Sequence, residues 1–185
     1  MTQRDLIKAL SALPCFRKVH PSAVAALAEV CPVRVFETGE AVLAQGEDTD
    51  VAYLLVDGML EVSVQTQRTW HHISAIRPGE MVGESALFIH GVQRNATVLA
   101  HTQSQCLELR PDALARLSGN VALVALELSL VATLSRRIRK TNLEIQAAWS
   151  KAHPEPTDEA LPATDGTRTF AGRLRSVFAG RGEKE

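Results

Sequence analysis

Residues 33–64 read "VRVFETGEAVLAQGEDTDVAYLLVDGMLEVSV", and the pattern in this stretch decides the fold. Short runs of β-branched and other apolar residues alternate with glycines, which is typical of antiparallel strands joined by tight turns. Gly39, Gly46 and Gly58 mark three such turns, and the pair Asp57-Gly58 between two apolar runs predicts a β-hairpin. The stretch therefore predicts a β-rich domain.

More short apolar runs follow this stretch. They are TWHHISAI at 69–76, ATVLA at 96–100 and QCLEL at 105–109. With the runs before them they make about seven or eight short strands separated by turn residues. Strands at this spacing favour a β-sandwich or β-roll over a parallel sheet.

Helical periodicity lies on both sides of the strands. Residues 4–13 and 20–32 place apolar side chains at helical spacing and each segment stops at a proline, so they predict two short helices, the second capped by Ser22. A short helix at 110–120 and a long one from 121 to about 149 follow. The prediction is an α+β fold: a β-roll, of the jelly-roll-like double-stranded β-helix type, flanked by N-terminal helices and a long C-terminal helix.

The long helix carries two apolar stripes. The heptad stripe has residues at heptad-compatible spacing: Val124, Leu128, Val131, Ile138 and Ile145. The second stripe lies beside it and contains Leu123, Leu126, Leu130 and Leu134. Two stripes indicate two partners. We expect one stripe to pack on the protein's own β-roll and the other to form a homodimer through residues 121–147.

The chain divides by composition into four parts. Residues 1–30 are expected to form the N-terminal helices, and residues 31–149 the β-roll with its short helix and long dimerisation helix. Residues 150–167 are rich in proline and acid and predict a flexible linker. Residues 168–185 combine a phenylalanine-containing apolar face with arginines and predict a basic amphipathic helix. This tail helix suits a protein partner, an anionic membrane surface or the chain's own β-roll.

The overall composition excludes several classes of protein. A net charge of -1 gives no global field that would attract nucleic acid or acidic lipid. Cys15, Cys31 and Cys106 form no CxxC pair, so we expect reduced core thiols rather than disulfides or a zinc site. The N-terminus lacks the continuous apolar region of a signal peptide, and no run is apolar enough to span a membrane. The expected location is therefore the cytoplasm.

The stretch "GEMVGESALFIHGVQRNATV" places an acid and an arginine, Glu84 and Arg94, among small and apolar residues. An exposed ion pair would contribute little to stability, whereas a ligand pocket would use both groups. Arginine offers a charge-assisted fork for a phosphate, and glutamate accepts hydrogen bonds from a ribose hydroxyl. Gly83 and Ala96 permit a close backbone approach, and a short helix beginning at Ser85 would direct N–H groups at the phosphate.

These residues resemble the phosphate-binding cassette of cyclic nucleotide-binding domains, with the Gly-Glu to Arg-x-Ala-Thr spacing of the protein kinase A regulatory subunit. The resemblance covers about residues 15–148, including the turn glycines. It implies that Glu84 contacts the ribose 2′-hydroxyl and that Arg94 contacts the cyclic phosphate. It also implies that the backbone of Gly83, Ala86 and Ala96 contacts the sugar-phosphate. The expected ligand-binding residues of the cassette are Gly83, Glu84, Ser85, Ala86, Arg94, Asn95 and Ala96.

The segment LSRRIRKTNLEI, residues 134–145, is similar to the dimerisation helix of the catabolite-activator branch of the family. In that branch a threonine and a neighbouring polar residue, one from each subunit, reach the adenine amino group. The match implies a base contact for Thr141 and Asn142 and a contact near the ribose-phosphate for Arg137. The alternative for Thr141 and Asn142 is that they fix the register of a helix pair. Asn95 stands where the family usually has alanine, serine or threonine, which leaves the choice of nucleotide open.

The sequence thus predicts a cyclic nucleotide sensor that acts through protein contact, with cAMP as the first candidate ligand. The alternatives are a nucleotide-independent interaction module on the same fold and a binder of cGMP or cyclic di-GMP. No Ser/His/Asp or Cys/His arrangement supports an enzyme. His71 and His72 are neighbours on a strand and point to opposite faces, so we expect no metal. The regulators of this family need a helix-turn-helix domain after the long helix, where a linker and one short helix remain, so direct DNA binding is not expected.

Overall fold

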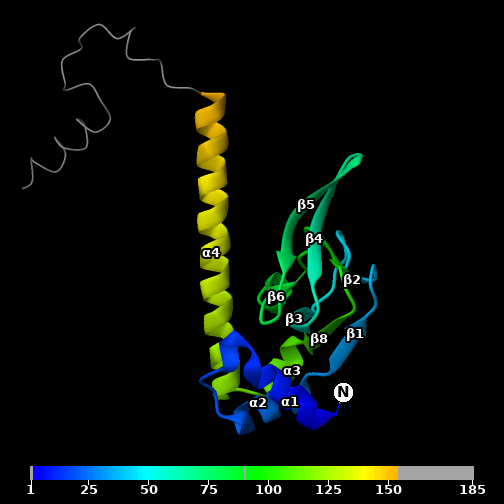
Figure 1. Ribbon diagram of the computed structural model, residues 1–185, viewed down its shortest axis with the longest axis vertical. Helices are drawn as coiled ribbons and strands as arrows, with labels where there is room; N and C mark the ends of the chain where they lie inside the picture. The colour runs from blue at the N-terminus through cyan, green and yellow to red at the C-terminus, as the bar shows by residue number, and fades with distance from the viewer. Residues whose placement is uncertain (1, 90, 154–185) are drawn as a thin grey trace, which may run out of the picture. The chain divides into compact units, whose positions relative to one another are not determined.

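The computed structural model describes residues 2–89 and 91–153. Within them two four-stranded antiparallel sheets are present: sheet A, with the strand order β1-β8-β3-β6, and sheet B, with the order β2-β7-β4-β5 (Figure 1). The strands are β1 (Val33–Phe36), β2 (Ala41–Leu43), β3 (Ala52–Asp57), β4 (Leu60–Thr66), β5 (Thr69–Ile76), β6 (Met81–Val82), β7 (Thr97–Ala100) and β8 (Ser104–Leu109). This arrangement confirms the predicted β-roll.

Strand β3 lies between two hydrophobic layers. Its residues from Ala52 to Val56 are all buried. Leu54 and Val56 pack in a cluster with the helices, whereas Tyr53 and Leu55 pack in a second cluster between the two sheets. A strand that is covered on both faces requires a continuous apolar run rather than an alternating one. The run AYLLV in β3 meets that requirement.

The turn at Asp57-Gly58 is not a hairpin, so that prediction is wrong. Strand β3 pairs with β6 and β8 of sheet A, and β4 pairs with β5 and β7 of sheet B. The turn therefore carries the chain from one sheet to the other. Gly58 has a φ of 97°, and a Cβ there would lie 2.6 Å from the Gln103 carbonyl oxygen, so the close approach needs glycine. The hairpin comes one strand later, where Thr66 pairs with Thr69 between β4 and β5.

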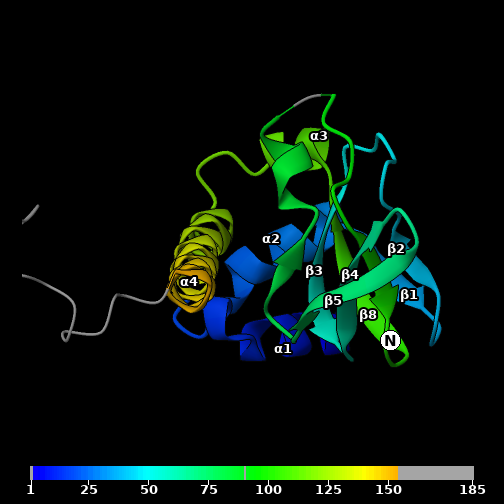
Figure 2. The same cartoon turned by 90° about the horizontal axis from the view of Figure 1, so that it is seen from above.

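The predicted N-terminal helices cover the face of sheet A that points away from sheet B (Figure 2). The N-terminal elements are α1 (Gln3–Ala12), the 3₁₀ helix η1 (Pro14–Phe16) and α2 (Pro21–Val30). Leu10 of α1 and Leu27 of α2 pack in the same cluster as Leu107 of β8. The predicted cap at Ser22 is wrong. His20 is the N-cap, since its Nδ1 accepts the Ser22 N–H at 3.3 Å and the helix starts with a proline, which needs no acceptor.

Two helices follow the last strand, α3 (Pro111–Ala115) and the 32-residue α4 (Val121–Ala152). In α4, Leu126 and Leu130 are buried, and Leu123 and Leu134 pack half-buried against the same cluster. The expectation that one stripe packs on the protein's own β-roll is therefore confirmed. The side chains of the heptad stripe have exposed fractions between 46% and 67%. The homodimer through this stripe stays a prediction.

The chain divides after Ile138 into two units. The β-roll, the short helices and α4 up to Ile138 belong to the first unit, and the rest of α4 belongs to the second. Helix α4 continues slightly beyond its expected end at residue 149. Residues 150–152 of the predicted linker (150–167) therefore belong to α4. Residues 154–167 and the predicted tail helix at 168–185 lie outside the described residues. No helix in residues 2–89 and 91–153 combines the length and the apolar character needed to cross a membrane.

Candidate functional site

The predicted site begins with a tight turn. Strand β6 leads into Gly83, whose φ is 74°, and then into the 3₁₀ helix η2 (Glu84–Leu87). A Cβ on Gly83 would lie 2.8 Å from Leu43 Cδ1 and 3.0 Å from Arg94 Nη1, so only glycine fits here. The short helix that the sequence predicts is present and starts one residue earlier than expected.

Helix η2 is a single turn, and part of its hydrogen-bonding capacity is already used. The Ala86 N–H donates to the Gly83 carbonyl oxygen at 3.2 Å. The backbone hydrogen bonds of the described residues outside regular helices and strands include none donated by the Glu84 or Ser85 amide. These two N–H groups are therefore available as donors to an anion, whereas that of Ala86 is already used.

A cavity of about 270 Å³ brings together eight of the ten predicted ligand-binding residues. They are Gly83, Glu84, Ser85, Ala86, Arg94, Asn95, Ala96 and Arg137. One side of the cavity thus consists of η2 and the segment before β7, which carry the charged and small residues. The strands of the roll supply apolar side chains to the other side, among them Val62, Ile73 and Val98. A polar end and an apolar wall suit an amphipathic ligand such as a nucleotide.

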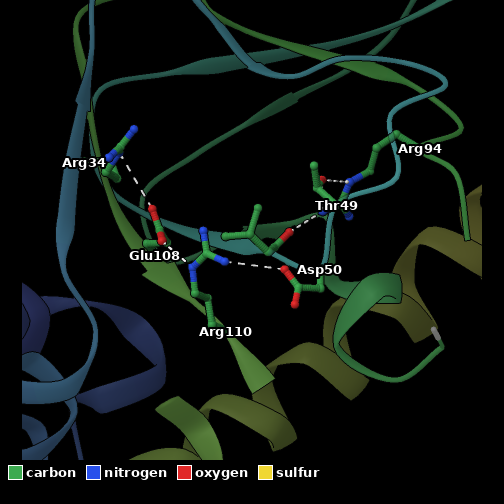
Figure 3. A network of polar contacts seen from close by, with 7 residues as sticks. Arg34, Thr49, Asp50, Arg94, Glu108 and Arg110 are labelled. Atoms are coloured by element: carbon green, nitrogen blue, oxygen red, sulfur yellow. Dashed lines mark hydrogen bonds and ion pairs between the residues drawn. The ribbon is translucent and has the colours of Figure 1, made fainter. Parts of the chain in front are cut away.

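Arg94 is buried, with 7% of its surface exposed, and a loop before β3 holds its guanidinium (Figure 3). Its Nε and Nη2 donate to the Thr49 hydroxyl oxygen at 3.1 and 2.9 Å. Nη2 also donates to the Val51 carbonyl oxygen, and Nη1 donates to the Gly83 carbonyl oxygen at 2.9 Å. A guanidinium has five N–H groups, so these four bonds fix its orientation and leave one N–H of Nη1 without an acceptor in the described residues.

The positive charge of Arg94 has no ion-pair partner in the described part of the chain. None of the ion pairs in residues 2–89 and 91–153 includes Arg94, and all of its acceptors are neutral oxygens. Burial lowers the pKa of Arg94, because the guanidinium loses hydration. A buried cation is costly unless an anion compensates it. The cavity therefore has the electrostatics of an anion-binding site.

Glu84 contacts Arg137 of α4, and both residues line the cavity. Arg137 Nη1 lies 3.4 Å from Glu84 Oε1, and its Nη2 donates to the Met81 carbonyl oxygen at 3.4 Å. The Glu84 side chain is only 14% exposed, and the Arg137 side chain is 38% exposed. The Glu84 carboxylate has lone pairs left for a ligand hydroxyl, since this contact uses only one of its oxygens. The pair also links the cassette to the part of α4 in the first unit.

The other predicted residues have different surroundings. Asn95 and Ser85 are exposed, and Ala96 is half-buried beside Arg94. Thr141 and Asn142 are exposed on α4 within the second unit. Their contact with a base stays a prediction.

Two features of the site were missed from the sequence. Strand β5 has a β-bulge at Ile73, because Val62 pairs with Ser74 while Ser63 pairs with His72. The bulge lets both Ile73 and Ser74 line the cavity, which strict alternation would forbid. Thr49 was also missed, since a threonine in a polar loop carries no pattern that connects it to an arginine 45 positions later.

The described residues hold no group of three or more His, Cys, Asp or Glu side chains that could bind a metal ion. His72 Nδ1 lies 2.8 Å from Glu61 Oε1, and His71 Nε2 lies 3.1 Å from Thr66 Oγ1. The two neighbouring histidines therefore have separate partners.

Residues 33–120 match the family model of the cyclic nucleotide-binding domain. The chain is 29% identical over 128 residues to a CRP-like cAMP-activated global transcriptional regulator of Mycobacterium tuberculosis, which covers 69% of this chain and 56% of the relative. It is 33% identical over 89 residues to a cGMP-dependent protein kinase of Eimeria tenella, which covers 48% of this chain and 8% of the relative.

A solved cyclic nucleotide-binding domain from Methylobacillus flagellatus has the same fold. Its TM-score is 0.64 at 19% identity, over 79% of this chain and 83% of that chain. The likeness to the cyclic nucleotide-binding domain family thus covers residues 33–120 of this chain. The chain spans about half or less of the length of the two curated relatives above.

Proposed function

We propose that this protein is a sensor that binds a 3′,5′-cyclic mononucleotide, with cAMP as the first candidate, and that it signals through contact with another protein. The observation that carries the proposal is the buried Arg94 cation, which has only neutral partners and lines the same cavity as Glu84. A cyclic phosphodiester is an anion next to a ribose hydroxyl. It would match this pair of groups in charge and in hydrogen bonding.

Each polar group of the cavity then has one role. The free N–H of Arg94 Nη1 and the amides of Glu84 and Ser85 donate to the phosphate oxygens. The Glu84 carboxylate accepts a hydrogen bond from the ribose 2′-hydroxyl, and Arg137 keeps that carboxylate in place. The base packs on the apolar wall formed by the strands. No step of bond breaking is needed, so the protein acts as a binding module rather than an enzyme.

The size of the cavity favours a mononucleotide. Its volume of about 270 Å³ lies near the lower end of the range for small-molecule sites, which is about 300–1,000 Å³. Cyclic di-GMP contains two nucleotides and would need about twice the space. Cyclic di-GMP is therefore the weakest of the three candidate ligands.

The choice between cAMP and cGMP depends on the base. The names of the relatives include both a cAMP-activated regulator and a cGMP-dependent kinase. Asn95 is exposed at the cavity, and its side-chain amide can accept from or donate to either purine. We place cAMP first because the cAMP-activated regulator matches the larger share of this chain.

Signalling by this protein would use helix α4. Val124, Val131, Ile138 and Ile145 follow each other at intervals of seven residues and are all exposed. A seven-residue apolar repeat is the seam of a coiled coil, so we propose that α4 pairs with the same helix of a second copy. Because Arg137 joins α4 to Glu84, nucleotide binding at Glu84 would change the position of this helix. The downstream partner would recognise that change.

Calorimetric titration of the protein with cAMP, cGMP and cyclic di-GMP tests the proposed function. We expect saturable binding with cAMP as the tightest ligand and cyclic di-GMP as the weakest. Tighter binding of cGMP would replace cAMP as the ligand and leave the rest of the proposal intact. A protein that binds none of the three is a nucleotide-independent interaction module, and the proposal is then wrong.

A further inference from the structure

The loop that holds Arg94 contains the polar run Glu47-Asp48-Thr49-Asp50, and Figure 3 shows Thr49 and Asp50 of this run. Among these side chains, only that of Thr49 hydrogen-bonds to the guanidinium. Its hydroxyl oxygen accepts from both Nε and Nη2 at 3.1 and 2.9 Å, so it receives one edge of the guanidinium. The next contact on that side is the carbonyl oxygen of Val51, in the same loop. The loop therefore sets the direction in which the remaining N–H of Arg94 points.

The acidic neighbour, Asp50, points to a different arginine. Asp50 Oδ1 lies 3.5 Å from Arg110 Nη1, and Arg110 Nε donates to Glu108 Oε1 at 2.7 Å. Glu108 is buried, and Arg34 Nε lies 3.7 Å from its other carboxylate oxygen. The hydrogen bond from Arg110 to Glu108 raises the pKa of Arg110. The Asp50 carboxylate is thus paired with Arg110, and Arg94 has no ion pair within residues 2–89 and 91–153.

We infer that Thr49 is a positioning residue for anion binding: it orients the Arg94 guanidinium toward the cavity without neutralising its charge. A carboxylate in that place would also orient the arginine, but its negative charge would weaken the attraction for a phosphate. A residue without an acceptor would leave two N–H groups of a buried guanidinium unpaired, and the side chain would then lose its fixed direction. Threonine satisfies both requirements. This inference rests on the proposed function, because it concerns the same site.

Replacing Thr49 by valine and by serine tests the inference. Thr49→Val keeps the shape of the side chain but removes the acceptor, whereas Thr49→Ser keeps the acceptor. We expect Thr49→Val to weaken cAMP binding about tenfold or more, the effect of losing hydrogen bonds to a charged group. Thr49→Ser should bind within about twofold to threefold of the parent protein. Thr66→Val on β4, which lies outside the site, is the matched control and should bind like the parent.

A double-mutant cycle with Arg94→Ala separates positioning from a general structural role. If Thr49 acts through the arginine, Thr49→Val should have no further effect on cAMP affinity once Arg94 is alanine. Equal losses in both backgrounds, or a Thr49→Val protein that binds cAMP like the parent, would overturn the inference while leaving the proposed function intact. A parent protein that binds no cyclic nucleotide would overturn the proposed function and this inference together. A thermal melt of each variant confirms that the proteins compared are folded.

Discussion

Replacing Glu84 by glutamine should weaken binding of ligands that carry a ribose 2′-hydroxyl more than binding of ligands that lack it. The substitution keeps the size of the side chain and removes its charge. A hydrogen bond to a charged acceptor contributes about 1.5–3 kcal/mol and one to a neutral acceptor about 0.5–1.5 kcal/mol. The difference of about 1–1.5 kcal/mol corresponds to a loss of cAMP affinity of about 5-fold to 12-fold.

The contact with Arg137 complicates this substitution and has to be separated from the effect on the ligand. Arg137 lies 3.4 Å from Glu84 and is partly exposed, so the pair contributes no more than about 1 kcal/mol. Its loss affects every ligand equally. Calorimetry with cAMP and with 2′-deoxy-cAMP therefore isolates the hydroxyl contact. We expect Glu84→Gln to lower the affinity for 2′-deoxy-cAMP by no more than about fivefold, which corresponds to about 1 kcal/mol. Equal losses of affinity for both ligands would refute the assignment of Glu84 to the 2′-hydroxyl. The control is Glu29→Gln, which replaces an exposed glutamate on α2.

Two further predictions concern assembly and the buried thiols. Replacing Val131 and Ile138 with glutamate should raise the dissociation constant of the homodimer by about 100-fold or more, because like charges would be buried across the helix seam. Sedimentation measures this dissociation constant, and Ala132→Glu, which lies outside the heptad stripe, is the control. A parent protein that is monomeric with cAMP bound would contradict the proposed dimer. Burial raises the pKa of Cys31 to about 11 and that of Cys106 to about 12. At pH 8 the thiolate fractions of Cys31 and Cys106 should be about 100-fold and 1,000-fold below those of the unfolded chain. Iodoacetamide should therefore label these cysteines far more slowly in the native protein than in the unfolded chain. Equal labelling rates in the two states would contradict their burial.

The direction of the pKa shifts of Cys31 and Cys106 also determines how these residues affect stability at different pH values. The folded-state pKa values lie above the ordinary value of 9.0, so the folded protein holds these protons more tightly than the unfolded chain does. The contribution of these two protonated thiols to the free energy of unfolding is fully present below pH 9 and is lost as the pH rises toward 11 and 12. Stability should therefore fall in alkaline solution, which a series of denaturant titrations above pH 9 would measure.

Local patterns in the sequence predicted most elements of the fold. Glycine-punctuated apolar runs predicted the strands, and the two apolar stripes of α4 predicted that one face of this helix packs on the roll. The hairpin at Asp57-Gly58 was wrong because the pattern of a turn does not tell which strands pair. That choice depends on β8, which lies about 50 residues later and pairs with β3.

The residues of the candidate site were predicted where one short segment carries them. Gly83, Glu84 and Arg94 lie within twelve consecutive residues and line one cavity. Thr49 and Ile73 were missed for different reasons. The bond from Arg94 to Thr49 depends on the tertiary fold, and Ile73 lines the cavity only because a bulge changes the register of β5.

The affinity of an Arg94→Ala variant for cAMP tests the proposed function most directly. The parent protein should bind cAMP with a saturable isotherm. Arg94→Ala should bind at least about tenfold more weakly, since it removes the uncompensated cation and its charge-assisted contact with the phosphate. Arg94→Lys, which keeps the charge without the fork, should fall between the two, and exposed Arg116→Ala should match the parent. A folded Arg94→Ala protein that binds cAMP as tightly as the parent would contradict the assignment of this cavity as the cyclic nucleotide site.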